Sequence, residues 1–360
     1  MPHLFKNVTG FVWRAKACPV ERLVLSKRVE IMKKTIILCI VLVTGGAGGC
    51  AKPELRSKTP AIGVSECEQP ELVFEAPTNL GPVVNSPYDD GSPDISADGL
   101  SLYFDSLRPD GAGSWDIWVT RRETVNSEWG PPESLGPPVN SRYGESGPCI
   151  SADGLTLYFA SDRPGGQGDF DIWVTTRKTT EAPWEEPVNL GPAVNSWAYD
   201  NHPSISADGL CLYFDSRRPN PSGSMGNNDL YVTKRASLAD GWGVAANLGP
   251  MVNTRNIEYS PNILRNGLIL FFDSRITDRD LWMTTRKSAD DDWAQAVSIG
   301  PPMNTPYIDT DPSMWVDGCI LYFVSTRPGG VGRFDIWQAA VTRDQSRTRE
   351  AEFVLHTRDK

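Results

Sequence analysis

The stretch PDISADGLSLYFDSLRP, residues 93–109, decides the fold because related stretches recur four more times along the chain. The later copies begin at Pro148, Pro203, Pro261 and Pro312, at intervals of 51 to 58 residues. In each copy an Asp-Gly or Asn-Gly pair, the strongest short signal for a hairpin turn, separates two runs. These runs are rich in β-branched and aromatic residues and are therefore typical of β-strands.

Two further runs complete each repeat. The first is an apolar run such as DIWVTRR from Asp116, and in four copies a shorter run such as WGPPESLGPPVN from Trp129 follows it. No segment shows helical periodicity, and the strands are apolar on both alternating faces, so both faces of each sheet must be covered. Four short strands per repeat with covered faces predict propeller blades. The sequence therefore predicts an all-β fold, a five-bladed β-propeller of four-stranded blades over residues 71–346.

The ends of the repeat array indicate how the ring closes. The run FEAPTNLGPVVN from Phe74 matches the fourth-strand run but precedes the first full repeat, and the last repeat, after Asp335, lacks that run. We therefore expect the N-terminal strand to pair into the last blade. The alternative is a sixth, degenerate blade to which residues 349–358 contribute.

The first fifty residues are typical of a targeting sequence and not of a folded domain. Residues 32–49 combine a short basic start, the apolar stretch TIILCIVLVT and small residues, the order of a secretory signal peptide. The ending resembles a bacterial lipoprotein signal, in which Cys50 becomes the lipid anchor, although Ala47 stands where that family usually has Leu. Residues 1–31 are interpreted as a start-site over-extension, with a genuine longer N-terminus as the alternative. Residues 50–70 are expected to form a lipid-anchored linker, and residues 347–360 a C-terminal tail.

Composition excludes several classes of protein. The chain has 35 basic and 45 acidic residues, a net charge of −10, which excludes a general nucleic-acid-binding surface. No apolar run reaches the length of a membrane span, and no CxxC pair points to a cysteine-rich zinc module. We predict no cofactor and no metal. Cys149, Cys211 and Cys319 occupy different positions in their repeats, so no disulfide is expected among these three.

The repeated pattern S-x-D-G-x-x-L-Y-F-x-S-x-R-P, followed by D-I-W, resembles the WD40-like (Pro-Asp) β-propeller repeat of TolB-like bacterial periplasmic proteins. The resemblance covers about three quarters of the chain. It implies an exported protein that binds other macromolecules through its propeller faces, and it does not imply an enzyme. The fourth repeat departs most, with Asn266 in place of Asp and no Arg-Pro after Ser274.

An acidic residue stands three positions before each repeat proline. In a propeller this position precedes the innermost strand, so we expect the five side chains to ring one mouth of the central channel. Such a ring is either a rim that binds a cation or an amine, or a solvated ring, since neighbouring carboxylates about 9 Å apart in water repel by only ~0.5 kcal/mol. The five residues are Asp90, Glu145, Asp200, Glu258 and Asp309.

The positions beside these acids differ between blades. His202, Tyr259 and Asp311 join Asn201 and the neighbouring acids on one side of the predicted mouth. Because the scaffold does not require such asymmetry, it indicates either choice of a ligand or drift on an exposed loop. One histidine cannot make a zinc site, although histidine with carboxylates can bind a metal weakly.

Arginine and aspartate recur on either side of the glycine-rich turn of each of four blades. An arginine fork can hold a carboxylate across a hairpin by two hydrogen bonds, and repetition in four blades favours a structural role over catalysis. The expected pairs are Arg108 with Asp116, Arg163 with Asp171, Arg218 with Asp229, and Arg327 with Asp335.

The function predicted from these features is a non-enzymatic cell-envelope lipoprotein that acts as a binding scaffold. We expect a monomeric propeller that lies at the periplasmic face of the outer membrane in a Gram-negative host, held by its lipid anchor alone. Its partner would be an envelope protein or a glycan or peptidoglycan-associated partner, bound at the channel mouth. The alternative is a glycan-binding or glycoside-hydrolysing five-bladed propeller that uses carboxylates at the mouth. A purely structural propeller is the third possibility.

Overall fold

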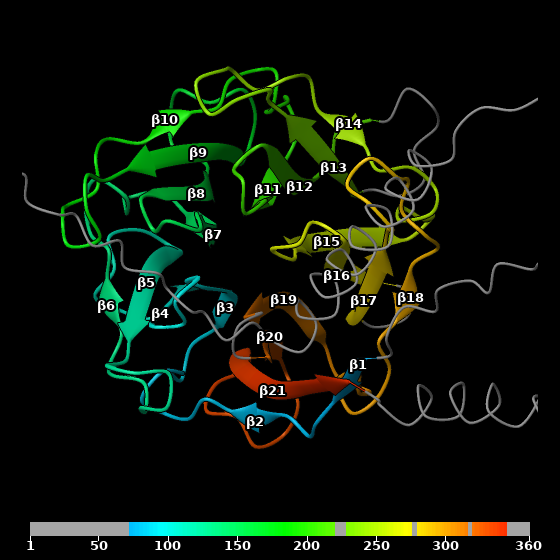
Figure 1. Ribbon diagram of the computed structural model, residues 1–360. Helices are drawn as coiled ribbons and strands as arrows, with labels where there is room; N and C mark the ends of the chain where they lie inside the picture. The colour runs from blue at the N-terminus through cyan, green and yellow to red at the C-terminus, as the bar shows by residue number, and fades with distance from the viewer. Residues whose placement is uncertain (1–71, 220–227, 276–278, 316–318, 344–360) are drawn as a thin grey trace, which may run out of the picture. The chain divides into compact units, whose positions relative to one another are not determined.

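The computed structural model describes residues 72–219, 228–275, 279–315 and 319–343. In these ranges it is all-β, and five sheets surround a central axis (Figure 1). The predicted five-bladed propeller is confirmed. The signal peptide, Cys50, the linker, residues 349–358 of the six-blade alternative and the tail 347–360 lie outside the described residues. No helix that could span a bilayer occurs in the ranges described.

Each blade is an antiparallel sheet, and in four blades the strands follow one another outward from the axis in chain order, whereas the last blade takes its outer strands from the N-terminal end. The innermost strands are β3 (Asp90–Ile95), β7 (Glu145–Ile150), β11 (Asp200–Ile205), β15 (Ile257–Ile263) and β19 (Asp309–Trp315). The second strands are β4 (Ser101–Ser106), β8 (Thr156–Ser161), β12 (Cys211–Ser216), β16 (Ile269–Arg275) and β20 (Ile320–Ser325). The third strands are β5 (Asp116–Arg121), β9 (Asp171–Thr176), β13 (Asp229–Lys234), β17 (Arg279–Thr285) and β21 (Asp335–Arg343). The outer strands are β6 (Glu133–Ser134), β10 (Val188–Asn189), β14 (Ala246–Asn247), β18 (Val297–Ser298) and β2 (Thr78–Asn79).

The N-terminal strand closes the ring as predicted. Strand β2 pairs with β21 in the last blade, with Thr78 opposite Gln338 and Asn79 opposite Trp337. The same sheet gains a strand that the sequence pattern did not predict, β1 (Leu72–Phe74), which also pairs with β21. The last blade is therefore built from both ends of the described chain.

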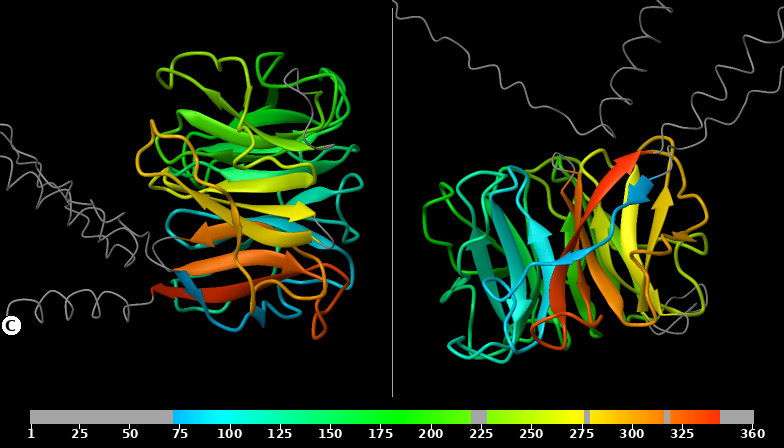
Figure 2. Two further views of the ribbon diagram at one scale, coloured as in Figure 1. Left: turned by 90° about the vertical axis from the view of Figure 1, so that its right-hand side faces the viewer. Right: turned by 90° about the horizontal axis from the view of Figure 1, so that it is seen from below.

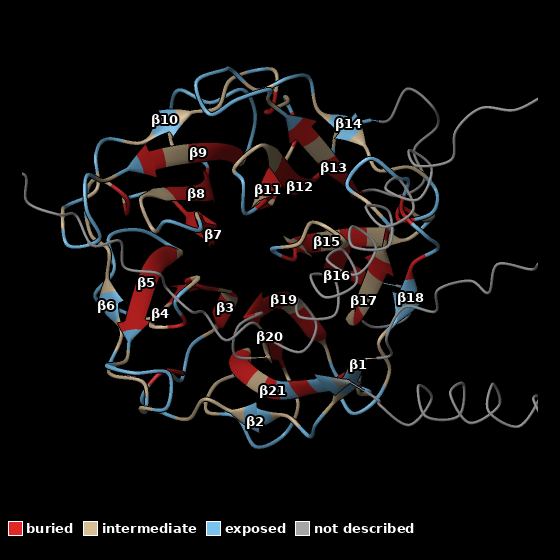
Figure 3. Ribbon diagram, in the orientation of Figure 1, coloured by how far each residue is buried: buried red, intermediate tan, exposed pale blue. Residues whose placement is uncertain are grey.

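The core lies between neighbouring blades, which explains why both faces of each strand are apolar. Leu102 and Phe104 on β4 pack toward the last blade, against Tyr322 and Ile336, whereas Tyr103 between them packs toward the second blade. Alternate side chains of one strand thus enter two different cores. Burial is concentrated in the three inner strands of the blades, while the short outer strands are largely exposed (Figure 3).

An asparagine side chain fixes the loop between consecutive blades. In the first case the amide of Asn140 donates to the carbonyl of Ile117 and accepts from its N–H, so the side chain pairs like a short strand. The same exchange recurs around the ring. The remaining pairs are Asn195 with Ile172, Asn253 with Leu230, Asn304 with Leu281, and Asn85 with Ile336.

Seen from the side, the sheets run between the two ends of the propeller (Figure 2). We call the end at which the innermost strands begin the acid face; it carries loops 86–89, 141–144, 196–199, 254–256 and 305–308. We call the opposite end, where the hairpins between the two inner strands lie, the turn face. The hairpin at Asp98–Gly99 forms as predicted, with Gly99 at a φ of 73° that favours glycine.

Candidate functional site

The five acids at the start of the innermost strands, each the first or second residue, do not form a solvated rim. The side chains of Asp90, Glu145, Asp200, Glu258 and Asp309 are all fully buried. They also line neither of the two channel pockets described below. Burial of a carboxylate needs hydrogen-bonded partners, and each acid has them within its own blade. The expectation of a wet ring at the mouth is therefore wrong, and a ligand-binding role for these five acids would require that they leave these partners.

The arginines after the second strands pair with these acids and not with the expected aspartates. Arg108 lies 2.5 Å from Asp90, and Ser106 donates to the same carboxylate at 2.6 Å. Three other blades repeat the ion pair at 2.5 to 3.0 Å: Arg163 with Glu145, Arg218 with Asp200, and Arg327 with Asp309. The first strand lies beside the end of the second, so its acid is nearer the arginine than the aspartate that begins the third strand.

The aspartates that begin the third strands instead organise the glycine-rich loops. The backbone N–H of Gly113 donates to Asp116, and those of Val331 and Gly332 donate to Asp335. Asp171 accepts in the same way from Gln167, and Asp229 accepts from the side chain of Asn247. The two members of each expected pair therefore make separate contacts, the arginine with the acid of the first strand and the aspartate within the loop or the outer strand.

A left-handed residue interrupts each innermost strand and turns the acids away from the axis. The residue two positions after each acid has a φ between 46° and 57°, and the pairing register shifts at this point. Such bulges redirect neighbouring side chains. The residues are Ser92, Gly147, His202, Ser260 and Asp311. Four of them are not glycine. For such residues the left-handed conformation costs roughly 1–3 kcal/mol each and often marks functional sites.

Charged side chains gather around these bulges at the acid-face end of the channel. Asp105, Asp215 and Asp273 occupy equivalent positions on the second strands β4, β12 and β16, and are nearly or fully buried. Bulge residues of neighbouring blades bring backbone N–H groups to them, from Gly147 to Asp105 at 2.9 Å and from Ser260 to Asp215 at 3.1 Å. We call the set of Asp105, His202, Asp215, Asp273, Arg279 and Asp311 the channel charge cluster.

His202 is held by Asp215, whose carboxylate lies 2.6 Å from Nδ1 of the imidazole. Burial alone lowers the pKa of this ring, but the negative charge and hydrogen bond of Asp215, with Asp311 and Asp105 nearby, raise the pKa of His202 to about 9. The side chain is therefore an imidazolium at neutral pH. His202 also lines one of the two channel cavities.

The other half of the cluster centres on Arg279. Its Nε donates to Asp273 at 2.8 Å, and the guanidinium stacks 4.5 Å from the ring centre of Tyr259. Burial raises the pKa of the Asp311 carboxyl, yet the positive charges of His202 and Arg279 outweigh it and lower the pKa overall. Burial, assisted by Asp311, instead raises the pKa of Asp105 to about 6.

The structure brings three of the residues that broke the repeat symmetry into one network. His202 and Asp311 belong to the channel charge cluster, and Tyr259 covers its arginine. A role for them in ligand binding stays a prediction. Sequence reasoning missed Asp105, Asp215 and Asp273, although a signal existed, because the equivalent positions in the other two blades hold Ala160 and Val324. No group of three metal-ligating side chains occurs among the residues described.

Two small cavities lie along the channel. The inner cavity, of about 30 Å³, lies beside the bulges and is lined by His202, Asp311 and the repeat prolines. The other, of about 90 Å³, opens at the turn face. Ligand pockets for drug-sized molecules have volumes of about 300–1,000 Å³. Neither cavity therefore encloses a sugar ring.

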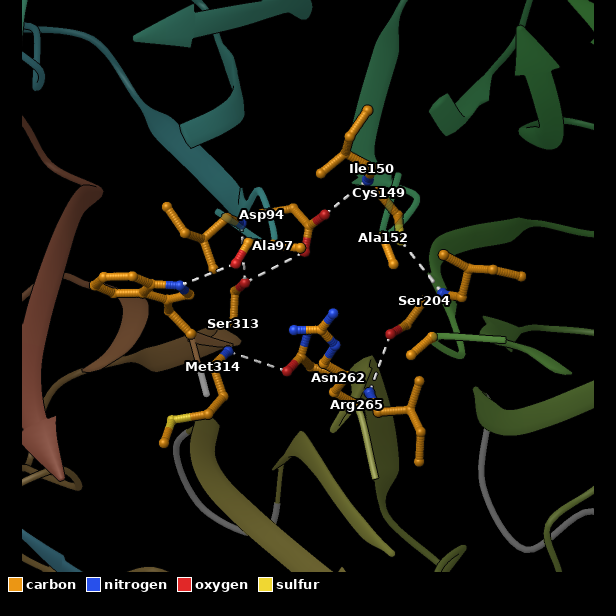
Figure 4. Close-up of a pocket in the computed structure, with 15 residues that line it drawn as sticks. Asp94, Ala97, Cys149, Ile150, Ala152, Ser204, Asn262, Arg265, Ser313 and Met314 are labelled. Atoms are coloured by element: carbon orange, nitrogen blue, oxygen red, sulfur yellow. Dashed lines mark hydrogen bonds between the residues drawn. The ribbon is translucent and has the colours of Figure 1, made fainter. Parts of the chain in front are cut away.

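A ring of hydrogen bonds surrounds the larger cavity and joins the blades (Figure 4). The residue four positions after each acid accepts a hydrogen bond from a backbone N–H of the next blade, as Asp94 does from Ile150 at 2.7 Å. The other four bonds run to Cys149 from Ile205, to Ser204 from Ile263, to Asn262 from Met314, and to Ser313 from Ile95. Four different residue types perform one structural task here.

Aromatic side chains stand exposed on the acid face. Trp197 is 72% exposed, Tyr88 48% and Tyr307 44%, each in a loop between an asparagine clamp and the following buried acid. Tyr143 lies in the corresponding loop and is half-buried under Arg142. Large aromatic residues are usually buried to a greater degree. Their exposure on one end of the molecule marks this end as a candidate binding surface.

The glycine-rich loops hold the aromatic loops in place by close contact. A Cβ on Gly168 would lie 2.5 Å from the carbonyl of Trp197, and one on Gly332 would lie 2.5 Å from that of Tyr88. Gly113 is packed in the same way against the backbone of Tyr143. These glycines therefore serve close packing of backbones, and the aromatic loops rest on a fixed support.

No protein-family model matches the chain, and no curated protein matches its sequence. Solved structures that resemble it include a protein assigned as TolB from Agrobacterium tumefaciens, with 15% identity, a TM-score of 0.43, and coverage of 72% of this chain and 91% of that chain. TolB from Acinetobacter baumannii has 14% identity and a TM-score of 0.44, over 70% of this chain and 55% of that chain. An alpha-L-arabinofuranosidase from Lactobacillus brevis has 15% identity and a TM-score of 0.47, over 74% and 92%. At these identities the likeness concerns the fold alone, and the chain is a five-bladed propeller by its own strand order.

Proposed function

We propose that this protein is a non-enzymatic binding scaffold of the cell envelope, which holds a protein or an envelope polymer on its acid face. The single observation that carries the proposal is the exposure of Trp197, Tyr88 and Tyr307 on that face. Tryptophan and tyrosine are the residues most enriched among those that dominate binding energy at interfaces. Exposed in the free protein, they are available to a partner.

The support beneath these side chains favours binding by a preformed surface. The backbones of Trp197 and Tyr88 pack against glycine-rich loops, and those loops are fixed by the aspartates that begin the third strands. A loop that is already ordered loses little conformational entropy when a partner binds. The acid face therefore presents its aromatic side chains at defined positions around the ring.

The channel favours binding over hydrolysis of glycosides. A glycosidase needs an acid and a base with separate pKa values on either side of a bound sugar, and Asp105 and Asp311 do have pKa values shifted in opposite directions. Their oxygens, however, accept hydrogen bonds from neighbouring blades, including Gly147 to Asp105 and Ser260 to Asp311. The adjoining cavity of about 30 Å³ leaves no room for a sugar between them. The glycan alternative is thus best supported as binding on the exposed aromatic rings.

Export is part of the proposal and rests on two features. The order of residues 32–49 and Cys50 is that of a lipoprotein signal. Independently, Cys319 is disulfide-bonded, whereas Cys149 and Cys211 are free. Disulfides form and persist in oxidising compartments such as the bacterial periplasm. We therefore propose an exported, lipid-anchored protein whose acid face is available to other envelope components.

The experiment compares capture by the native protein and by a variant with Trp197→Ala, Tyr88→Ala and Tyr307→Ala. Proteins cross-linked in host envelopes are identified by mass spectrometry, and co-sedimentation with purified peptidoglycan tests the polymer. The matched control carries Leu238→Ala and Val244→Ala, two exposed apolar residues of loop 235–245 on the turn face. We expect the first variant to lose the partner and the control to keep it. Retention by both, or turnover of chromogenic glycosides by the native protein, would contradict the proposal.

A further inference from the structure

The small cavity at the turn face, the end of the channel remote from the aromatic loops, is lined by two residues that depart from the repeat pattern. At the position that holds Ala97, Ala152 and Ala207 in three blades, the fourth blade has Arg265. All four residues line the cavity of about 90 Å³. Arg265 is thus the one departure from a small side chain among the described members of this set, and it lies among the residues that line the cavity (Figure 4).

The second departure is Asp94. In the ring of hydrogen bonds between blades, the equivalent positions hold the uncharged residues Cys149, Ser204, Asn262 and Ser313. An uncharged acceptor therefore suffices for the structural task, and Asn262 performs it with an amide oxygen. A carboxylate in this place adds a buried negative charge, which is costly, and the ring has no need of it.

The other lining residues are of two kinds. Ser204, Asn262 and Ser313 are polar and belong to the ring of hydrogen bonds between blades. Ile95, Ile150, Ile205, Ile263, Met314 and Trp315 give the cavity an apolar portion. A molecule of a few heavy atoms fits the volume. An arginine suits a carboxylate, an aspartate suits an ammonium group, and the apolar portion suits an alkyl group. These three features together describe one class of compound.

We propose that the turn-face cavity binds a small zwitterion, a free α-amino acid with a short alkyl side chain, with its carboxylate on Arg265 and its ammonium group on Asp94. A monocarboxylate or a simple amine supplies only half of the complement. The site is separate from the acid face, so this proposal does not depend on the proposed binding of a macromolecule there.

The test uses the whole exported chain and isothermal titration calorimetry at pH 8. The probes are L-alanine, propionate, which lacks the ammonium group, and ethylamine, which lacks the carboxylate. We expect saturable binding of L-alanine with a dissociation constant of about 1 mM or tighter, within the efficiency that such small ligands reach. Propionate and ethylamine should each bind at least tenfold more weakly. Absence of alanine binding, or equal binding of either half-molecule, would overturn the proposal.

Two substitutions keep the test independent of folding, because each installs a residue that another blade already carries at the same place. Arg265→Ala introduces the alanine that the first blade has at Ala97, and Asp94→Asn introduces the asparagine that the fourth blade has at Asn262. Both variants should fold and lose alanine binding at least tenfold, whereas Arg121→Ala, an exposed arginine outside the cavity, should keep it. Burial raises the pKa of Asp94 to about 7, so binding by the native protein should weaken at pH 5.5. Unchanged affinity in either cavity variant would refute the assigned contacts.

Discussion

The side-chain amide of Asn85 and the backbone of Ile336 exchange two hydrogen bonds, of 2.9 and 3.0 Å, across 251 positions of sequence. The same exchange joins Asn195 to Ile172 across only 23 positions. One contact type therefore has two roles. In four blades it fixes a local loop, and in the last blade it helps to hold the N-terminal segment on the C-terminal strand.

Removal of the Asn85 clamp should destabilise the closing blade. In Asn85→Ala the buried N–H and carbonyl of Ile336 lose their partners, which costs about 2 kcal/mol or more. Urea unfolding should show this loss, and hydrogen exchange should show it first in β21, because β2 is only two residues long. The comparison is Asn195→Ala, which should lose similar free energy but keep protection in β21. Equal protection of β21 in both variants would contradict the closing role.

The buried ion pairs predict a large effect at one arginine and almost none at another. Arg163→Ala leaves the fully buried Glu145 carboxylate without its positive partner, and loss of one member of a buried pair costs roughly 3–5 kcal/mol. Arg121→Ala removes an ion pair with Glu133 in which both side chains are at least half exposed. Such surface pairs contribute only about 0–1 kcal/mol. Chemical denaturation of the two variants at pH 7 measures the difference, and comparable losses would be inconsistent with the assigned pairing.

The close approach at Gly168 predicts a linked loss of stability and of binding. In Gly168→Ala the new Cβ lies 2.5 Å from the carbonyl of Trp197, so the aromatic loop has to move. Overpacking of this kind costs about 1–3 kcal/mol. Gly241→Ala is the matched control, since nothing lies within 4 Å of a Cβ there. Thermal unfolding and the envelope-capture assay should change in the first variant alone; a neutral Gly168→Ala would show that the loop is not held by this contact.

The His202–Asp215 pair predicts a loss of stability in alkaline solution. The folded-state pKa of about 9 lies above the ordinary value of 6.5, so the stabilisation is fully present below pH 6.5 and disappears as the pH rises through 9. The melting temperature of the native protein should therefore fall between pH 6.5 and pH 9.5. In His202→Gln this part of the pH dependence should vanish. An NMR titration of the single described histidine that gave an ordinary pKa would disprove the strength of the pair.

The buried carboxyl group of Asp94 predicts a stability that depends on pH, because an uncharged residue could accept the same hydrogen bond. Burial raises its pKa from 3.8 to about 7, so the wild-type carboxyl favours the folded state only below about pH 4 and loses that advantage as the pH rises through 7. Asp94→Asn should thus be more stable than wild type at pH 8, by about 1.4 kcal/mol for each pKa unit that the shift retains, and similar at pH 4. The reverse change, Asn262→Asp, should destabilise at pH 8. Identical pH profiles for the variants and wild type would rule out the burial of this charge.

The repeats made the fold predictable from the sequence, whereas the bulge in each innermost strand made the arrangement of the acids unpredictable. Five copies of one pattern and a fourth-strand motif ahead of the first copy were enough to predict the blades and the closing strand. The register shift after Asp90 or Asp200 leaves no such mark, because Ser92, His202, Ser260 and Asp311 take the left-handed conformation without being glycine. A regular strand would have placed the acids on the axis. The bulge turns them into the blade, next to the arginines.

Sequence analysis identified only some residues of the channel charge cluster, for a related reason. His202 and Asp311 stood out because they break the repeat next to a proline. Asp105, Asp215 and Asp273 lie inside the run LYFDS or its equivalent, where strand character dominates the pattern. Their role depends on which blade neighbours which, and on the bulges that bring backbone N–H groups to them. Spacing along the chain does not contain that information.

Pairing of β2 with β21 also determines when the ring can close during synthesis of the chain. Thr78 and Asn79 meet Gln338 and Trp337 only after nearly all of the propeller has been synthesised, and contacts between such remote positions form slowly. Until then the first strand has no blade to join, and the circle stays open. Four of the five blades consist of strands that are consecutive in the chain, so the last blade alone needs both ends of the propeller, and the ring is complete only when its C-terminal strands have been made.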